Sequence, residues 1–438
     1  MSDTITESPT DWKSAAMRKR VKSRYRKERI FKSFGLVALL IAGFFLVSLI
    51  GKIVIDGSGG FFQTSIEIDV PFQADILGDP QEMALGDFEK KVRSTNMMRL
   101  IQAAMALHFP EVKNRRDRRQ LMRMMSTGAR EQLRTMILDD PAIVGTVKRV
   151  SLLASDDIDQ VIKGNIDINL PETSRKVKDK EVAWLNKFQS EGRVSVNFHT
   201  LFFTNGDSRE PELAGIWGAT MGSLLTLVVT LFTAFPIGVL TALYLEEFAP
   251  RNRFTDFIEV NINNLAAVPS IVFGLLGLAL FLGVMGLPRS APLVGGLTLA
   301  LMTLPTIIIA ARASIKAVPP SIRDAARGMG ASQMQVVFHH VLPLAMPGIL
   351  TGTIIGMAQA LGETAPLLMI GMVAFIVDIP SGVTDAATAL PVQIFLWSDS
   401  PERAFVEKTS AAIMVLLSFL ITMNAIAIWL RQKFERQW

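Results

Sequence analysis

The chain of 438 residues contains no cysteine, only two tyrosines and only four histidines. The lack of cysteine excludes disulfide bonds and thiolate metal sites. The sequence also lacks Gly-x4-Gly-Lys-Ser/Thr, the loop that holds nucleotide phosphates in many ATP-hydrolysing proteins, and the glycine-rich stretch 55–60 has no lysine. We therefore expect no catalytic site and no bound cofactor in this chain. The adjacent His339 and His340 would face different sides of a helix, so no metal site is expected either.

Apolar and charged residues occupy different parts of the chain: half of the residues are apolar, although 19% are charged. Residues 1–32 are strongly basic, and the apolar run that follows, 34–55, is interrupted only by Lys52. A cleaved signal peptide is the alternative to a membrane helix, but no small-residue cleavage site follows this run. We expect an uncleaved first transmembrane helix over 33–55, with the basic tail 1–32 in the cytoplasm.

No segment between residues 56 and 213 is long and apolar enough to cross a membrane. Alternating apolar residues predict strands over 66–70 and 194–198. Helical spacing predicts helices over 96–108 and 117–137, and Asp140 followed by Pro141 predicts the start of another. The region 56–213 is therefore expected to be a soluble α+β domain.

The C-terminal region 214–438 is much more apolar and is expected to contain five further transmembrane helices. These spans lie at about 216–245, 264–286, 293–311, 346–374 and 409–430. Lysine and arginine follow the second, fourth and sixth spans, which places both termini in the cytoplasm and the insert 56–213 in the periplasm. The expected fold class is an all-α polytopic membrane bundle of six transmembrane helices with an inserted soluble α+β domain, in a bacterial inner membrane.

The longest cytoplasmic connection, residues 318–343, has the composition of a short helix lying against the membrane face. Its prolines favour a helix start, its alanines permit close approach of another protein, and its glycine permits a sharp turn. Such a helix can pass rigid-body motion from a cytoplasmic partner into the bundle; the alternative is an ordinary loop with a solvated aspartate. The residues concerned are Asp324, Ala325, Ala326, Gly330, Leu342 and Pro343.

This connection resembles the coupling loop, or EAA motif, of ABC importer permeases, with Asp324 in place of the usual glutamate. Three other stretches, 236–247, 264–274 and 360–368, resemble the second, third and fifth helices of phosphate-importer permeases. The Ala-Pro-Leu-Leu that ends the last stretch is similar to the A-type subunit. The resemblance covers about residues 213–438 and implies the type I ABC importer permease fold, whereas the insert is absent from shorter family members.

The resemblance implies that the chain is a permease subunit of an ATP-driven inorganic phosphate importer that works by alternating access. The implied partners are a homologous C-type permease, a dimeric cytoplasmic ATPase that binds the ATP, and a periplasmic phosphate-binding protein. The chain would contact membrane lipid and no nucleic acid. Molybdate or sulfate is the alternative substrate. A membrane-anchored ligand sensor is the alternative function, but no cytoplasmic output domain is found for it.

Polar residues in or near the expected spans are candidates for the translocation pathway or gate. They are Gln359, Glu363, Thr364, Asn264 and Ser270. An ionisable group at membrane depth is functional by default, but the carboxylate of Glu363 would repel phosphate. We expect this residue to act as a gate or to pair with Thr364 or the partner permease, unless it reaches water at the end of the span.

Gln359 stands where family members often carry arginine, so a cation is expected from the partner subunit, or the pathway is less positive here. Arg312, where acidic residues are common in the family, is expected to return positive charge to the inner end of the fourth span. Asn264 and Ser270 either line an aqueous path or cap and join helices.

Overall fold

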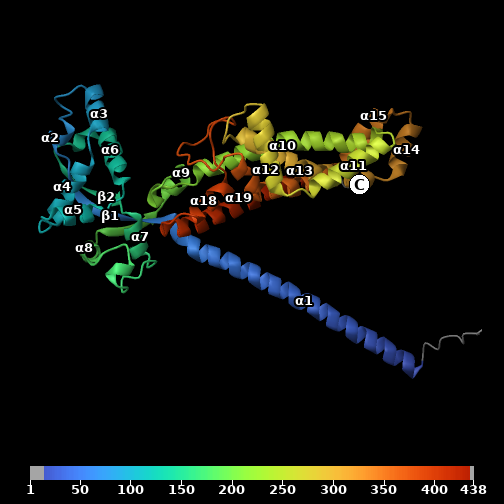
Figure 1. Ribbon diagram of the computed structural model, residues 1–438, viewed down its shortest axis with the longest axis horizontal. Helices are drawn as coiled ribbons and strands as arrows, with labels where there is room; N and C mark the ends of the chain where they lie inside the picture. Colours follow the sequence, from blue (N-terminus) through green and yellow to red (C-terminus); the bar gives the residue numbers. More distant parts are fainter. Residues whose placement is uncertain (1–13, 435–438) are drawn as a thin grey trace, which may run out of the picture. The chain divides into compact units, whose positions relative to one another are not determined.

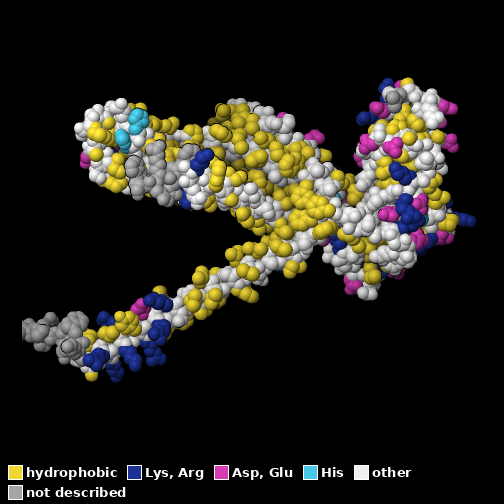
Figure 2. All heavy atoms as spheres, turned by 180° about the vertical axis from the view of Figure 1, so that it is seen from behind, with side chains coloured by type: hydrophobic (Ala, Val, Ile, Leu, Met, Phe, Trp, Pro, Cys, Tyr) yellow, Lys and Arg dark blue, Asp and Glu magenta, His cyan; other side chains and the backbone are white. Residues whose placement is uncertain are grey.

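The computed structural model describes residues 14–434, and the chain divides into two compact units, 1–55 and 56–438. The first unit is formed by helix α1 (Ala15–Ser58), which continues into the start of the second (Figure 1). Lysine and arginine side chains gather over its N-terminal part and apolar side chains cover the rest (Figure 2). From Ala15 onward the basic segment is therefore helical and continuous with the expected first span.

The insert is built on a three-stranded antiparallel sheet with the order β2-β1-β3. The strands are β1 (Phe62–Pro71), β2 (Val147–Leu153) and β3 (Val194–Phe198). The alternation that predicted β1 is confirmed, because Ile66, Ile68 and Val70 are all fully buried. In the central strand Ile68 pairs with Val150 of β2, and Ile66 pairs with Val194 of β3.

Eight helices of four or more residues complete this part of the described chain. They are α2 (Ala74–Leu77), α3 (Leu85–Ser94), α4 (Met98–His108), α5 (Arg115–Met122), α6 (Ala129–Asp139), α7 (Asp156–Ile162), α8 (Asp179–Ser190) and α9 (Thr200–Thr204).

The single helix predicted over 117–137 is wrong, because α5 and α6 are separate helices. The chain between them pairs with the end of β2: Met125 forms a bridge with Ala154, and the Ser126 N–H donates to the Leu153 carbonyl at 3.0 Å. The helix expected after Asp140 is only a short 3-10 turn, Pro141–Ile143. Tertiary pairing with the sheet thus overrides the local helical pattern.

The C-terminal region is a helical bundle. Its elements are α10 (Trp217–Leu243) with η5 (Tyr244–Phe248), α11 (Arg253–Ala266), α12 (Ser270–Gly277) with η6 (Leu278–Val284), α13 (Pro292–Lys316), α14 (Pro320–Gly328), α15 (Gln333–Gln335) with η7 (Val336–Val341) and α16 (Leu342–Gly362), α17 (Ala365–Met369), α18 (Leu390–Ser398) and α19 (Ala404–Phe434).

Within residues 14–434, five helices are long and apolar enough to cross a membrane, and the bent pair α11 and α12 makes a sixth span if counted as one. The expected all-α membrane bundle with an N-terminal extra region is confirmed. Its outer surface is broadly apolar (Figure 2), with Phe232 74% and Phe254 69% exposed. Such a surface suits contact with lipid.

Three boundaries differ from those expected. The third span is bent by 104° between α11 and α12, at Pro269. The fifth ends at Gly362, because Glu363 is extended (φ −80°, ψ 122°) and a separate helix, α17, follows it. The helical run into this span begins at Gln333, so His339 and Pro343 lie in helix and not in a loop.

Close packing in the bundle depends on small residues. A β-carbon at Gly296 of α13 would lie 2.5 Å from Cβ of Val229 in α10, and one at Gly238 of α10 would lie 2.7 Å from Ile307 in α13. The Thr230 hydroxyl also donates to the Gly296 carbonyl at 3.1 Å. Without a hydrophobic force between helices in lipid, such close approach and interhelical hydrogen bonds hold α10 and α13 together.

The insert is joined to the last membrane helix by a group of largely buried charged and polar side chains, here called the junction cluster: Asp159, Lys163, His199, Glu407 and Lys408. The Lys163 ammonium lies 2.7 Å from the Asp159 carboxylate in α7 and 3.0 Å from the Glu407 carboxylate in α19. The Lys408 ammonium lies 2.6 Å from Nδ1 of His199. These pairs hold the sheet domain against the start of α19.

Candidate coupling surface and translocation pathway

Helix α14 presents one face to solvent and buries the other. Pro319 caps the helix and Pro320 is its first residue, as the sequence predicts. The Asp324 side chain is 74% exposed, and Ala325 is also exposed. Ala326 is only 2% exposed and packs in the core cluster that includes Val336. The helix therefore offers a short polar and small-residue surface to another protein.

The remaining loop residues support this surface. Gly330 has φ +87°, a conformation that favours glycine, and its N–H donates to the Arg327 carbonyl at 2.9 Å. Leu342 packs against the same core cluster as Ala326, so two residues of the sequence motif, sixteen positions apart, share one core. Pro343 lies inside the helical run and does not begin it.

Arg323 fixes α14 to the bundle, a role that the sequence analysis did not assign. Its guanidinium donates to the Glu247 carboxylate at 2.7 and 3.1 Å, and to the carbonyls of Val318 at 2.6 Å and Ile315 at 2.9 Å. The Glu247 side chain is only 6% exposed. Planar guanidinium groups suit such multiple recognition, so Arg323 ties α14 to η5 and to the end of α13.

Arg312 does not supply free positive charge to the inner end of the fourth span. Its guanidinium lies 2.7 Å from the Glu246 carboxylate and 2.7 Å from the Glu259 carboxylate. Two carboxylates around one guanidinium leave a net negative group, which contradicts the expected compensation. The triad instead ties α13 to η5 and α11.

The structure places Glu363 at the break between α16 and α17, so it lies at the end of the span and not inside it. Its side chain is half-buried, whereas Gln359, one turn earlier, is exposed. Within residues 14–434, no hydrogen bond or ion pair joins the Glu363 carboxylate to Thr364 or to any other group. The side chains of Glu363 and Gln359 are therefore accessible, the first in part, to water or to another subunit.

Ser270 lies close to this break, but Asn264 belongs to a different element. Helix α12, which begins at Ser270, packs on α17: a β-carbon at Gly274 would lie 2.8 Å from Cα of Pro366. Asn264 is exposed on α11, on the other side of the 104° bend. Neither side chain makes a capping hydrogen bond within the described residues.

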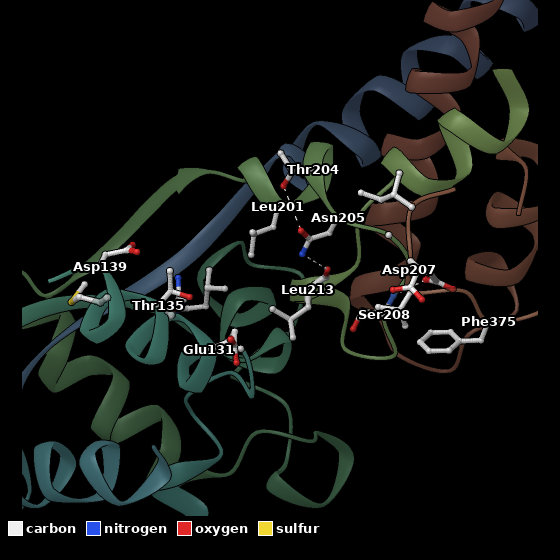
Figure 3. Close-up of a pocket in the computed structure, with 18 of the residues that line it drawn as sticks. Glu131, Thr135, Asp139, Leu201, Thr204, Asn205, Asp207, Ser208, Leu213 and Phe375 are labelled. Carbon is white, nitrogen blue, oxygen red and sulfur yellow. Dashed lines mark hydrogen bonds between the residues drawn. The ribbon is translucent and has the colours of Figure 1, made fainter. Parts of the chain in front are cut away.

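A groove of about 970 Å³ lies between α6, the segment 201–213 and the loop 375–379 (Figure 3). Its lining includes five carboxylates and no lysine, arginine or histidine: Glu131, Asp139, Asp140, Asp207 and Asp378. Burial raises the pKa of Asp207, which accepts a hydrogen bond from Nε1 of Trp397 at 2.9 Å. The other carboxylates make the groove unfavourable for an anionic substrate.

Two family descriptions match the chain. Residues 18–172 match a domain of unknown function (DUF3333), and residues 234–438 match the binding-protein-dependent transport system inner membrane component. Among solved structures, an inward-facing MetNI methionine ABC transporter is 18% identical with a TM-score of 0.42, over 50% of this chain and 98% of that one. The bundle and the match over 234–438 define the class: membrane permeases of binding-protein-dependent transport systems.

Two individual relatives define a narrower family than this class. The chain is 30% identical over 222 residues to phosphate transport system permease protein PstA 1 of Mycobacterium tuberculosis H37Rv, covering 51% of this chain and 71% of that protein. It is 32% identical over 218 residues to PstA of Mycobacterium leprae, covering 49% and 70%. The chain therefore belongs to the family of phosphate transport system permeases of the PstA type, with an additional N-terminal domain.

Proposed function

We propose that this chain is the A-type permease subunit of an ATP-driven importer of inorganic phosphate. The observation that carries the proposal is α14, whose exposed Asp324 and Ala325 are fixed to the membrane bundle by Arg323. A helix so placed is suited to receive motion from a cytoplasmic ATPase. The substrate is taken from the relatives, which are named phosphate transport permeases.

The second permease of the pathway is proposed to be a homologous C-type subunit. PstC of Haemophilus influenzae is 29% identical to this chain over 226 residues, so both kinds of subunit share one ancestral fold. A pseudo-symmetric pair would enclose the exposed faces that carry Gln359 and Asn264. Because Glu363 repels an anion, we assign it, with Thr364 and Ser270 beside it, to the gate and not to direct phosphate binding.

The remaining parts follow from the positive-inside rule. The tail 1–32, α14 and the C-terminus are cytoplasmic, the segment 33–55 is the first span, the insert 56–213 is periplasmic, and 214–438 is the permease domain. A dimeric ATPase would bind the ATP, and a periplasmic binding protein would deliver phosphate. This chain would carry substrate without catalysing a reaction.

Phosphate uptake in starved cells tests the proposal. With the gene deleted in a strain that has no other high-affinity phosphate importer, uptake of labelled phosphate is expected to fall to background and to return on restoration. Labelled molybdate and sulfate are measured in parallel. Unchanged phosphate uptake with loss of one of these oxyanions would overturn the substrate assignment and keep the permease assignment.

A further inference from the structure

Helix α5 and the residue after it form the most basic segment of the insert. They contain five arginines: Arg115, Arg116, Arg118, Arg119 and Arg123. Arg116, Arg119 and Arg123 are three and four positions apart, which places them on one helical face. Like charges so spaced repel one another, and a bound counter-charge would relieve this repulsion.

This face forms one wall of a pocket of about 370 Å³. The rest of the lining comes from the segment before α8, with Lys176 and Lys178, and from the residues around the start of α7, with Ser155 just before it. Five cationic side chains and two acidic ones, Asp157 and Glu181, line it. We call it the arginine pocket.

The two acidic side chains do not neutralise the arginines. The Glu181 carboxylate accepts the Lys178 backbone N–H at 2.7 Å, and the Asp157 carboxylate lies 4.0 Å from the Lys176 ammonium. Within residues 14–434, the guanidinium groups of Arg116, Arg119 and Arg123 have neither an ion-pair partner nor a hydrogen-bond acceptor. Three donors with fixed geometry therefore remain available on one wall.

A polar group in the pocket lining points to the same conclusion. The Ser155 hydroxyl is buried, and none of the residues that the structure describes offers it a hydrogen bond. A buried hydroxyl without a partner is destabilising, and such groups are rare in native proteins. An oxygen-rich anion in the pocket would accept from this hydroxyl and from the guanidinium groups at once.

We propose that the arginine pocket binds a phosphate group. Arginine suits this ligand because its planar donors match the oxygens of phosphate. The pocket draws its cations from two separate segments of the chain, α5 with Arg123 and the segment before α8, which fits a compact tetrahedral anion better than a flat protein surface. The group is either free inorganic phosphate or the headgroup of an anionic phospholipid, and the site is separate from the membrane pathway.

The test uses the full-length chain, purified without its ATPase, so that transport is not required. The pocket variant is the triple substitution Arg116→Gln, Arg119→Gln and Arg123→Gln. The control, Arg93→Gln, Arg99→Gln and Arg115→Gln, removes the same charge from exposed positions outside the pocket. Unchanged thermal unfolding of both variants confirms that they fold.

Two probes distinguish the sources of the phosphate group. Equilibrium dialysis measures labelled inorganic phosphate on chain in phosphatidylcholine nanodiscs, and native mass spectrometry measures phosphatidylglycerol retained by chain in detergent. We expect the affinity for one probe to fall about tenfold or more in the pocket variant and to stay unchanged in the control.

A change with inorganic phosphate identifies the free anion as the ligand, and a change with phosphatidylglycerol alone identifies a lipid headgroup. Equal binding of both probes by the pocket variant and the control would overturn the site. Neither result depends on which substrate the transporter carries, so failure of this inference leaves the proposed transport function intact.

Discussion

At the scale of single residues, burial shifts the pKa of His199, a member of the junction cluster, and that of Glu212, whose carbonyl His199 contacts. His199 is 2% exposed, and burial together with Lys408 lowers its pKa to about 3, so the imidazole is neutral. Its Nε2 lies 2.8 Å from the Glu212 carbonyl and must donate, which leaves Nδ1 to accept from the Lys408 ammonium. The neutral ring thus links two elements through one tautomer.

Glu212 gives this region a measurable pH dependence. Its side chain is buried, Oε2 has no hydrogen-bond partner in the described structure, and burial raises its pKa from 4.5 to about 7. Between these two values the folded chain holds a proton that the unfolded chain has lost. Its contribution to stability is therefore present at low pH and is lost as the pH rises through this window. His199 contributes in the opposite direction below pH 6.5.

The substitution Glu212→Gln is expected to remove the pH-dependent contribution of Glu212 to stability and to leave that of His199. Relative to the unsubstituted chain, the variant should gain up to about 3 kcal/mol in stability between pH 4.5 and pH 8, because the amide never ionises. Thermal unfolding of the full chain in nanodiscs at several pH values measures this difference. Glu210→Gln, at an exposed neighbour, should show no such trend. A pH-independent effect of Glu212→Gln would contradict the raised pKa.

At the scale of elements, the ion pair between Arg323 and Glu247 stabilises α14 more than the hydrogen bonds within this short helix do. A helix of nine residues is marginal in isolation. The Arg323 side chain is 16% exposed and that of Glu247 is 6% exposed, so loss of one partner leaves the other charge buried and uncompensated. The position of the coupling surface therefore depends on this pair.

Arg323→Met is expected to destabilise α14 by about 3 kcal/mol and to speed amide exchange over residues 320–328. Hydrogen–deuterium exchange with mass spectrometry measures the effect. Arg327→Met is the matched control, because this side chain is 50% exposed and lies 3.9 Å from Asp324. The double variant with Glu247→Leu should recover much of the protection. Equal exchange in both single variants would show that the pair does not position α14.

Elements with local signals could be predicted from the sequence, and those decided by distant contacts could not. Strand β1 and helix α14 were predicted because alternation and prolines act within a few residues. The break between α5 and α6 depends on the bridge from Met125 to Ala154, and the end of α16 coincides with packing of α17 on α12. The ion pairs of Arg312 join elements more than fifty residues apart, so the sequence alone led to the wrong expectation.

At the scale of the whole second unit, the junction cluster links the insert to the last helix of the permease region. Lys163 contacts α19 through Glu407 and also donates to the backbone carbonyls of Gly59 and Phe62, where the first helix enters the sheet. Breaking such a buried pair is strongly destabilising. Through Lys163 the insert therefore contacts the start of α19 directly.

The proposed function requires the exposed face of α14 to couple ATP hydrolysis to phosphate transport. Proteoliposomes that contain the complete complex with Asp324→Lys test it most directly, because the charge is reversed on a side chain that is 74% exposed. Phosphate uptake driven by ATP and binding of the ATPase are measured together. We expect uptake to be lost while the chain remains folded and inserted. Normal uptake together with normal ATPase binding in this variant would contradict it.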